Sequence, residues 1–171
     1  MQDTTPESLQ THHFDPKKYT IKTLEDEIKV DTLCQVLLKD YHNYLLKNKG
    51  ISPLQAGSHA SGADYFLRDF MIDNRRTNIT DITPELIHGF AGNWYIINTL
   101  EPNMEELESI LHGIEFFYRF CAEKNMLAPI LVEKIGQACS RIDYYRERIE
   151  SFHAISGDGY SVWNSSCPLN K

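Results

Sequence analysis

Two Glu-x-x-His pairs, Glu85 with His88 and Glu150 with His153, are the arrangement in this chain that most suggests metal chemistry. On helices, with acids from other helices, such pairs could form a di-iron carboxylate site. They also arise by chance in a chain of 171 residues with seven histidines and many glutamates. Glu85 follows a proline in a predicted first helical turn, where the helix dipole favours an acid. We therefore expect no metal ion and no cofactor.

The four cysteines, Cys34, Cys121, Cys139 and Cys167, include no Cys-x-x-Cys pair. The spacing of a zinc ribbon or a thioredoxin-like site is therefore missing. Cys34, Cys121 and Cys139 lie in apolar helical patterns, as reduced core thiols do. No histidine or cluster of bases adjoins them, which disfavours a nucleophilic or redox role. Unpaired cysteines are typical of a reducing compartment, so we expect a cytoplasmic protein.

A set of cations and polar side chains could contact the phosphates of double-stranded DNA. The set comprises Lys17, Lys18, Arg68, Arg75 and Arg76, with Ser58 and His59 on a polar helix face. Phosphate contacts supply most non-specific affinity and require clustered lysine and arginine. Asp64, Asp69 and Asp73 are interleaved with the arginines, a pattern that also suits solvent-exposed ion pairs. The net charge of -7 excludes a protein whose entire surface binds polyanions.

Helical periodicity dominates the middle of the chain, and no strand-like alternation persists. Caps, prolines and apolar stripes predict five helices, at about residues 31–49, 53–73, 84–97, 104–125 and 129–152. Glycines within the small-residue stretch 56–63 would cost helix propensity, so we expect another element to approach the backbone closely there. The predicted fold is all-α, a compact bundle of about five helices forming one domain over residues 21–155.

The two ends of the chain lack this periodicity. Residues 1–20 are polar, and we expect a flexible N-terminal arm that does not resemble a signal peptide. Residues 156–171 follow a glycine break but carry Tyr160, Val162 and Trp163, which are large for a loose tail. This segment is expected to fold back on the body or to dock on a partner, including a second copy. No apolar run is long enough to cross a membrane, so no membrane contact is expected.

The order of several segments is informative. The segments are Tyr41-x-x-Tyr44-Leu45, Gly50-Ile51-Ser52-Pro53, Tyr65-Phe66-Leu67-Arg68-Asp69-Phe70, Ile79-Thr80-Asp81-Ile82-Thr83-Pro84-Glu85 and Phe116-Phe117-Tyr118-Arg119-Phe120. Together they resemble the N-terminal core-binding domain of tyrosine recombinases, the SAM-like fold of phage integrases. The resemblance covers about residues 28–152. It implies a helical module that binds duplex DNA, or an accessory in recombination, because members of that family hold DNA with this domain and cut it with another.

The family's catalytic groups have no counterpart in this sequence. They include a His-x-x-Arg pair and a tyrosine nucleophile, and none of the seven histidines here precedes an arginine by three residues. Phosphoryl transfer needs positioned cations at the phosphate, so we expect a protein that is not an enzyme. Two hypotheses stay open: DNA binding, and a protein-interaction or regulatory module that binds no DNA. A contiguous basic face would favour the first, and an exposed apolar patch with dispersed charge would favour the second.

Overall fold

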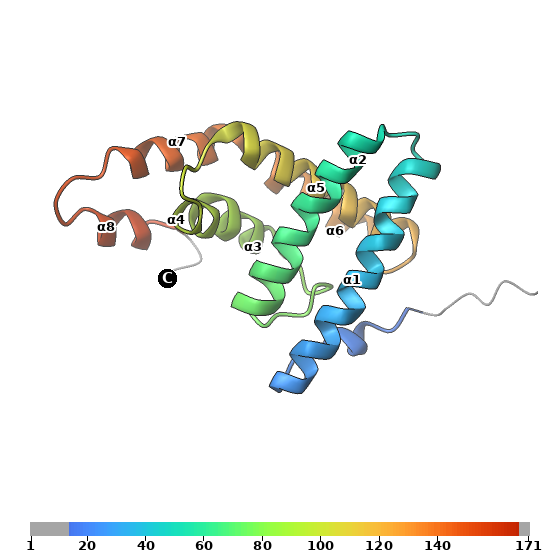
Figure 1. The fold of residues 1–171 in the computed structure, drawn as a ribbon. Coiled ribbons are helices and arrows are strands. Elements are labelled where there is room, and N and C mark those ends of the chain that lie inside the picture. Colours follow the sequence, from blue (N-terminus) through green and yellow to red (C-terminus); the bar gives the residue numbers. More distant parts are fainter. Residues whose placement is uncertain (1–13, 168–171) are drawn as a thin grey trace, which may run out of the picture.

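The computed structural model describes residues 14–167, and all regular structure in that range is helical. This confirms the all-α prediction. The elements are η1 (Pro16–Tyr19, a 3-10 turn), α1 (Leu24–Lys47), α2 (Pro53–Asp64) with its π-helical continuation η2 (Tyr65–Asn74), α3 (Pro84–Gly89) with the π-helical η3 (Phe90–Trp94) and α4 (Tyr95–Asn98), α5 (Met104–Glu123), α6 (Pro129–Cys139), α7 (Ile142–His153) and α8 (Tyr160–Ser165). In Figure 1, α1 lies beside α2 at one side of the molecule, and α7 and α8 lie at the other.

The described range contains seven continuous helices, not about five, if α2–η2 and α3–η3–α4 each count as one. The helix predicted over 129–152 is divided between α6 and α7, because the chain turns at Ser140. Ser140 Oγ donates to the Gln137 carbonyl at 2.8 Å, and the Tyr145 hydroxyl donates to the Ala138 carbonyl at 2.6 Å. These side chains satisfy carbonyls at the end of α6 that a continuing helix would use. The other additional helix is α8.

The first helix starts earlier than predicted. Thr23 Oγ1 accepts a hydrogen bond from the Asp26 N–H, and the Asp26 carboxylate accepts one from the Thr23 N–H, each at 3.1 Å. This reciprocal capping box begins α1 at Leu24. Asp31, the predicted cap, lies inside the helix instead. The prediction was wrong because aspartate is a common cap residue but also tolerated within a helix that starts elsewhere.

Three other predicted helix starts are confirmed. The side chains of Ser52, Thr83 and Asn103 each accept a hydrogen bond from the backbone N–H three residues later. Pro53 and Pro84 occupy the first helical position, where a missing N–H costs no hydrogen bond. These caps fix the residues at which α2, α3 and α5 begin.

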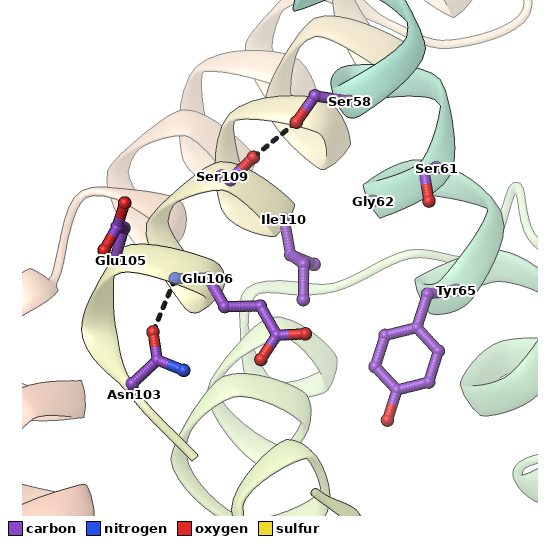
Figure 2. A pocket seen from close by; sticks show the side chains of 9 residues that line it. All are labelled: Ser58, Ser61, Gly62, Tyr65, Asn103, Glu105, Glu106, Ser109 and Ile110. Carbon is purple, nitrogen blue, oxygen red and sulfur yellow. Dashed lines mark hydrogen bonds between the residues drawn. The ribbon is translucent and has the colours of Figure 1, made fainter. Parts of the chain in front are cut away.

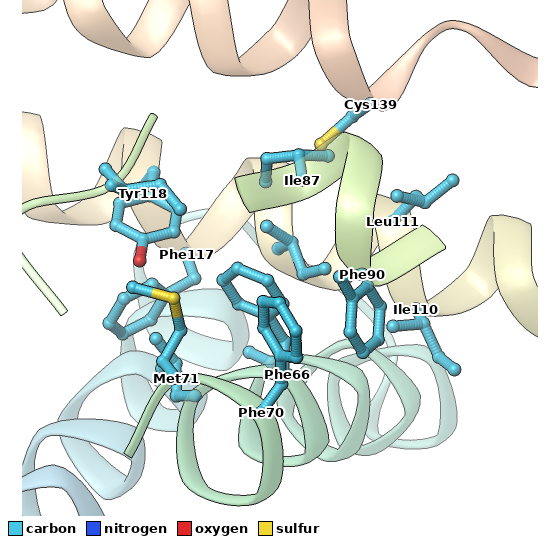
Figure 3. Close-up of a cluster of buried hydrophobic side chains, with 14 of the residues drawn as sticks. Phe66, Phe70, Met71, Ile87, Phe90, Ile110, Leu111, Phe117, Tyr118 and Cys139 are labelled. Carbon is cyan, nitrogen blue, oxygen red and sulfur yellow. The ribbon is translucent and has the colours of Figure 1, made fainter. Parts of the chain in front are cut away.

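Aromatic side chains from η2, η3 and α5 fill the core (Figure 3). The rings of Phe66, Phe70 and Phe90 pack with centroids 5.0 to 5.6 Å apart. Two buried hydroxyls are satisfied by backbone carbonyls at 2.9 Å: Tyr41 donates to α5, and Tyr118 donates to the loop before α3. A satisfied hydroxyl can be buried at little cost. These two bonds therefore join α1 and that loop to α5.

The backbones of α2 and α5 approach each other closely. A Cβ atom on Gly62 would lie 2.8 Å from the Cα of Ile110, and one on Gly113 would overlap the carbonyl oxygen of His59. No side chain larger than hydrogen fits at these two positions. The close approach predicted from the small residues of α2 is thus confirmed at Gly62. Gly57 has no atom within 4 Å of an added Cβ, so the close approach does not account for it.

Both ends of the described range are packed against the body. Pro16–Tyr19 form η1 and Tyr19 is buried, so the expectation of a flexible arm is wrong for residues 14–20. The first 13 residues of that arm and residues 168–171 lie outside the described range. The C-terminal segment folds back through α8, with Trp163 and Cys167 buried. No helix in the described range has both the length and the apolar character needed to cross a bilayer.

Candidate functional site

An open groove of about 330 Å³ runs between α1 and η2. Its lining residues are Leu24, Glu27, Ile28, Asp31 and Thr32 from α1, and Arg68, Asp69, Ile72 and Asp73 from η2. On the α1 side, Leu24 and Ile28 are 68% and 61% exposed. On the η2 side, Asp69 and Asp73 are exposed carboxylates. The groove therefore offers an apolar edge opposite an acidic edge.

The one cation that lines this groove, Arg68, is engaged by acids. Its Nε donates to Asp31 Oδ1 at 2.8 Å, and its Nη1 donates to Asp64 Oδ1 at 3.3 Å. The hydrogen bond from Arg68 holds the pKa of the Asp31 carboxyl below its usual value, and burial acts against it. Arg68 was expected to contact DNA. The structure commits it to two carboxylates instead, so it offers little free charge to a phosphate.

Asp69 and Asp73 take part in no ion pair with any residue in the range 14–167. The pKa of Asp69 is raised, first because neighbouring atoms partly desolvate this exposed carboxyl, and then because Asp64 and Asp73 lie nearby. Arg68 acts in the opposite direction without cancelling these effects. The potential at this edge of the groove is therefore negative.

Ser58 and His59, the other predicted DNA contacts on α2, are both used against α5. Ser58 Oγ lies 2.8 Å from Ser109 Oγ, and the His59 ring packs 5.1 Å from the Phe116 ring between centroids. His59 is buried, and burial lowers its pKa below the ordinary 6.5. The assignment of His59 to a DNA-binding surface is therefore wrong. Small, polar residues on this helix face serve helix packing.

The remaining predicted contacts gather at one end of the molecule. Asn78 Nδ2 donates to the Pro16 carbonyl at 2.8 Å, which holds η1 against the loop after η2. Lys17, Lys18 and Arg75 are exposed there, and none forms an ion pair within the described part of the chain. The fourth cation, Arg76, pairs with Glu27 at 3.1 Å. The seven predicted residues thus do not act as one group: Ser58 and His59 contact α5, and within the described range Arg68 and Arg76 are both paired with acids.

A second open pocket, of about 600 Å³, lies between α2 and the start of α5 (Figure 2). Its lining residues are Ser58, Ser61, Gly62, Tyr65, Asn103, Glu105, Glu106, Ser109 and Ile110. Asn103 Oδ1 accepts from the Glu106 N–H at 2.9 Å, and the Glu106 carboxylate accepts from the Tyr95 hydroxyl at 2.9 Å. Of the residues that the structure describes, hydroxyls and acids but no cation line this pocket, so it disfavours phosphate.

The C-terminal residues expected to bind a partner divide into two kinds. Trp163 is buried: its ring stacks on the guanidinium of Arg148, and its Nε1 donates to Ser151 Oγ at 3.0 Å. The partner-binding assignment of Trp163 is therefore wrong, because the ring is buried against Arg148 of the same chain. Tyr160 and Val162 remain exposed on the outside of α8.

The Glu-x-x-His pairs do not meet. His153 Nε2 lies 3.3 Å from the Pro102 carbonyl oxygen, and the half-buried His88 ring packs near Tyr144. Residues 14–167 hold no group of three or more His, Cys, Asp or Glu side chains placed to bind a metal ion.

A comparison of the chain with protein-family models, curated proteins and solved structures found no match. The groove between α1 and η2 was not predicted from the sequence. Leu24 and Ile28 precede the start predicted at Asp31, so their shared helix face was not recognised. Thr23-x-x-Asp26 is the signal that could have revealed it, because this spacing places a capping box before two apolar residues one turn apart.

Proposed function

We propose that this chain is a non-catalytic helical module that binds another protein through the outer surface of α1. The observation that carries the proposal is a concentration of exposed apolar side chains on that helix. In addition to Leu24 and Ile28, Leu33 and Val36 are 36% and 55% exposed. Isolated exposed apolar residues are common, whereas apolar side chains that lie next to one another mark an interaction surface. Leu33 and Val36, three residues apart, share one side of α1, as Leu24 and Ile28 do at the start of the helix.

The distribution of charge supports the same proposal. Cations on several helices are paired with acids of their own turn, as in Lys29 with Glu25 and Arg146 with Asp143. Paired, dispersed charges produce little potential beyond a Debye length of about 8 to 10 Å. Such a surface attracts a polyanion weakly but does not hinder a protein interface. The free, buried cysteines support a reducing and therefore cytoplasmic location for the module.

Binding of duplex DNA is a second candidate, in keeping with the resemblance to SAM-like core-binding domains. The docking of η1 favours it, because that contact brings Lys17 and Lys18 to the same end of the molecule as Arg75. Three free cations would neutralise few phosphates, and affinity rises steeply with the number neutralised. We therefore place DNA binding second.

Affinity capture with matched baits tests the first candidate. The baits are the wild-type chain, Leu33→Ser with Val36→Ser on α1, and Leu54→Ser with Leu100→Ser, two exposed leucines elsewhere. We expect at least one protein from source-cell lysate to be recovered equally by the wild type and the control, and about tenfold less by the α1 variant. Equal recoveries by all three baits would contradict the proposal. Circular dichroism confirms that each bait is folded.

A further inference from the structure

We infer that the groove between α1 and η2 binds a basic amphipathic helix of a partner protein. This inference rests on the proposed function, since it specifies the partner chemistry at one edge of the same helix. It uses the apolar edge formed by Leu24 and Ile28 and the acidic edge formed by Asp69 and Asp73.

The apolar edge matches the spacing of a helical ligand. Leu24 and Ile28 are four residues apart on α1, which is one turn, or about 6 Å along the helix axis. The groove extends from Leu24 to Thr32 along α1, about two turns, and buried Ile72 lies against it. A helix that carries apolar residues at positions i and i+4 can cover both exposed side chains at once. Covering them removes apolar surface from water.

The acidic edge selects the charge of that ligand. Asp69 and Asp73 are also four residues apart, on the opposite wall. Because Arg68 is paired with Asp31 and Asp64, no cation among the described lining residues is left to neutralise them. Lysine or arginine residues one turn apart on the partner helix would meet these two carboxylates while its apolar residues meet α1. Charge complementarity of this kind favours one partner class and repels others.

The same charges disfavour the alternative occupants. A second copy would bring a chain of net charge -7 against an acidic groove, which is a charge of the same sign, and this raises the electrostatic cost of association. DNA phosphates would meet the same repulsion. A basic helix from a different protein is therefore the occupant that the groove fits.

The test uses the full chain and a fluorescent 18-residue peptide with leucine and lysine at amphipathic helical spacing, together with a matched peptide in which glutamate replaces lysine. Anisotropy is measured at low salt. Groove variants are Asp69→Asn with Asp73→Asn, and Leu24→Ser with Ile28→Ser. The charge control, Asp81→Asn with Asp158→Asn, removes two exposed carboxylates outside the groove.

We expect the wild type to bind only the lysine peptide. Each groove variant should weaken binding about tenfold, and the control less than about twofold.

Two results would overturn the inference. If the groove and control variants weaken binding equally, peptide binding depends only on the net charge of the chain and not on the groove. If the wild-type chain binds neither peptide, the groove does not accept a basic helix. In both cases, selective loss of a captured protein by the Leu33 and Val36 variant would leave the proposed function intact. A concentration-dependent dimer in sedimentation that the Leu24 and Ile28 variant abolishes would instead assign the groove to a second copy, which also overturns the inference.

Discussion

The guanidinium of Arg148 lies 3.9 Å from the centroid of the Trp163 ring and also donates to the carbonyl of Trp163 at 2.9 Å. Its Nε donates to the Gly92 carbonyl and its Nη1 also donates to Ser166 Oγ, each at 2.7 Å, whereas its buried Nη2 has no hydrogen-bond partner within the described range. Arg148 forms no ion pair with an acid in the described range, and burial lowers its pKa because removal of water disfavours the charge. A buried cation with neutral acceptors therefore joins α7 to η3 and α8.

Replacing Arg148 by methionine should lower the free energy of unfolding by about 2 to 4 kcal/mol, because several buried acceptors lose their donor. Arg148→Lys should also be destabilising, since an ammonium group cannot reproduce the planar fork of donors. Urea denaturation measures both. Arg146→Met, at an exposed ion pair, is the control and should change stability by less than about 0.5 kcal/mol. If Arg148→Met unfolds like the wild type, Arg148 does not hold α8 in place.

Alanine scanning of three glycines tests the contact between α2 and α5. Gly62→Ala and Gly113→Ala should each destabilise the fold by about 1 to 3 kcal/mol, because the added methyl group meets backbone atoms that cannot move aside. Gly57→Ala is the matched control in the same helix as Gly62. It has open space and should stabilise by about 0.5 to 1 kcal/mol through helix propensity. Thermal denaturation ranks the stabilities of the three variants and the wild type. If Gly62→Ala stabilises the fold, α2 and α5 lie farther apart than described.

Stability should fall below about pH 6.5 because two histidines are partly or wholly buried. Burial lowers the pKa of His59, and burial together with the charge of Arg141 lowers that of His88, from the ordinary 6.5. Between the folded and unfolded pKa values the unfolded chain binds more protons, so acidification favours unfolding. The urea midpoint should therefore drop between pH 7.5 and 5.5. The double variant His59→Gln with His88→Gln should show a smaller drop; an equal drop would place the effect in other groups.

Thiol accessibility tests the core cysteines. Burial raises the pKa of the Cys34 thiol to about 12 and also raises the pKa values of Cys121 and Cys139. Because the thiolate is the reactive form, these three should react with Ellman's reagent only when the chain unfolds. Absorbance is compared in buffer and in about 6 M guanidinium. Rapid reaction of three or more thiols in buffer would contradict the described packing.

Much of the fold could be predicted from local signals. Ser52-Pro53 and Thr83-Pro84 act through their own backbone, so their helix starts were evident without tertiary information. The apolar spacing of Leu107, Leu111 and Ile114 likewise indicated the buried face of α5, and all three are buried. The turn at Ser140 was not evident, because it depends on Tyr145 donating across the turn to α6.

The candidate site was far less accessible from the sequence. Arg68 looked like a DNA contact because its neighbours along the chain include only one of its two partners, Asp64. The other, Asp31, lies 37 residues away on α1. Trp163 looked like a partner contact for the same reason, since its cation is on another helix. The roles of charged and aromatic residues depend on their contacts in the folded chain, and composition and sequence spacing do not specify these contacts.

The measurement that tests the central claim most directly is a paired titration of the full chain. A labelled duplex of about 30 base pairs and the lysine–leucine peptide are each titrated by anisotropy at about 50 and 200 mM salt. We expect the peptide to bind and the double variant Asp69→Asn with Asp73→Asn to weaken that binding, while the duplex shows no micromolar binding. Micromolar duplex binding that falls steeply at the higher salt, with no binding of the peptide, would contradict this expectation and favour DNA as the partner.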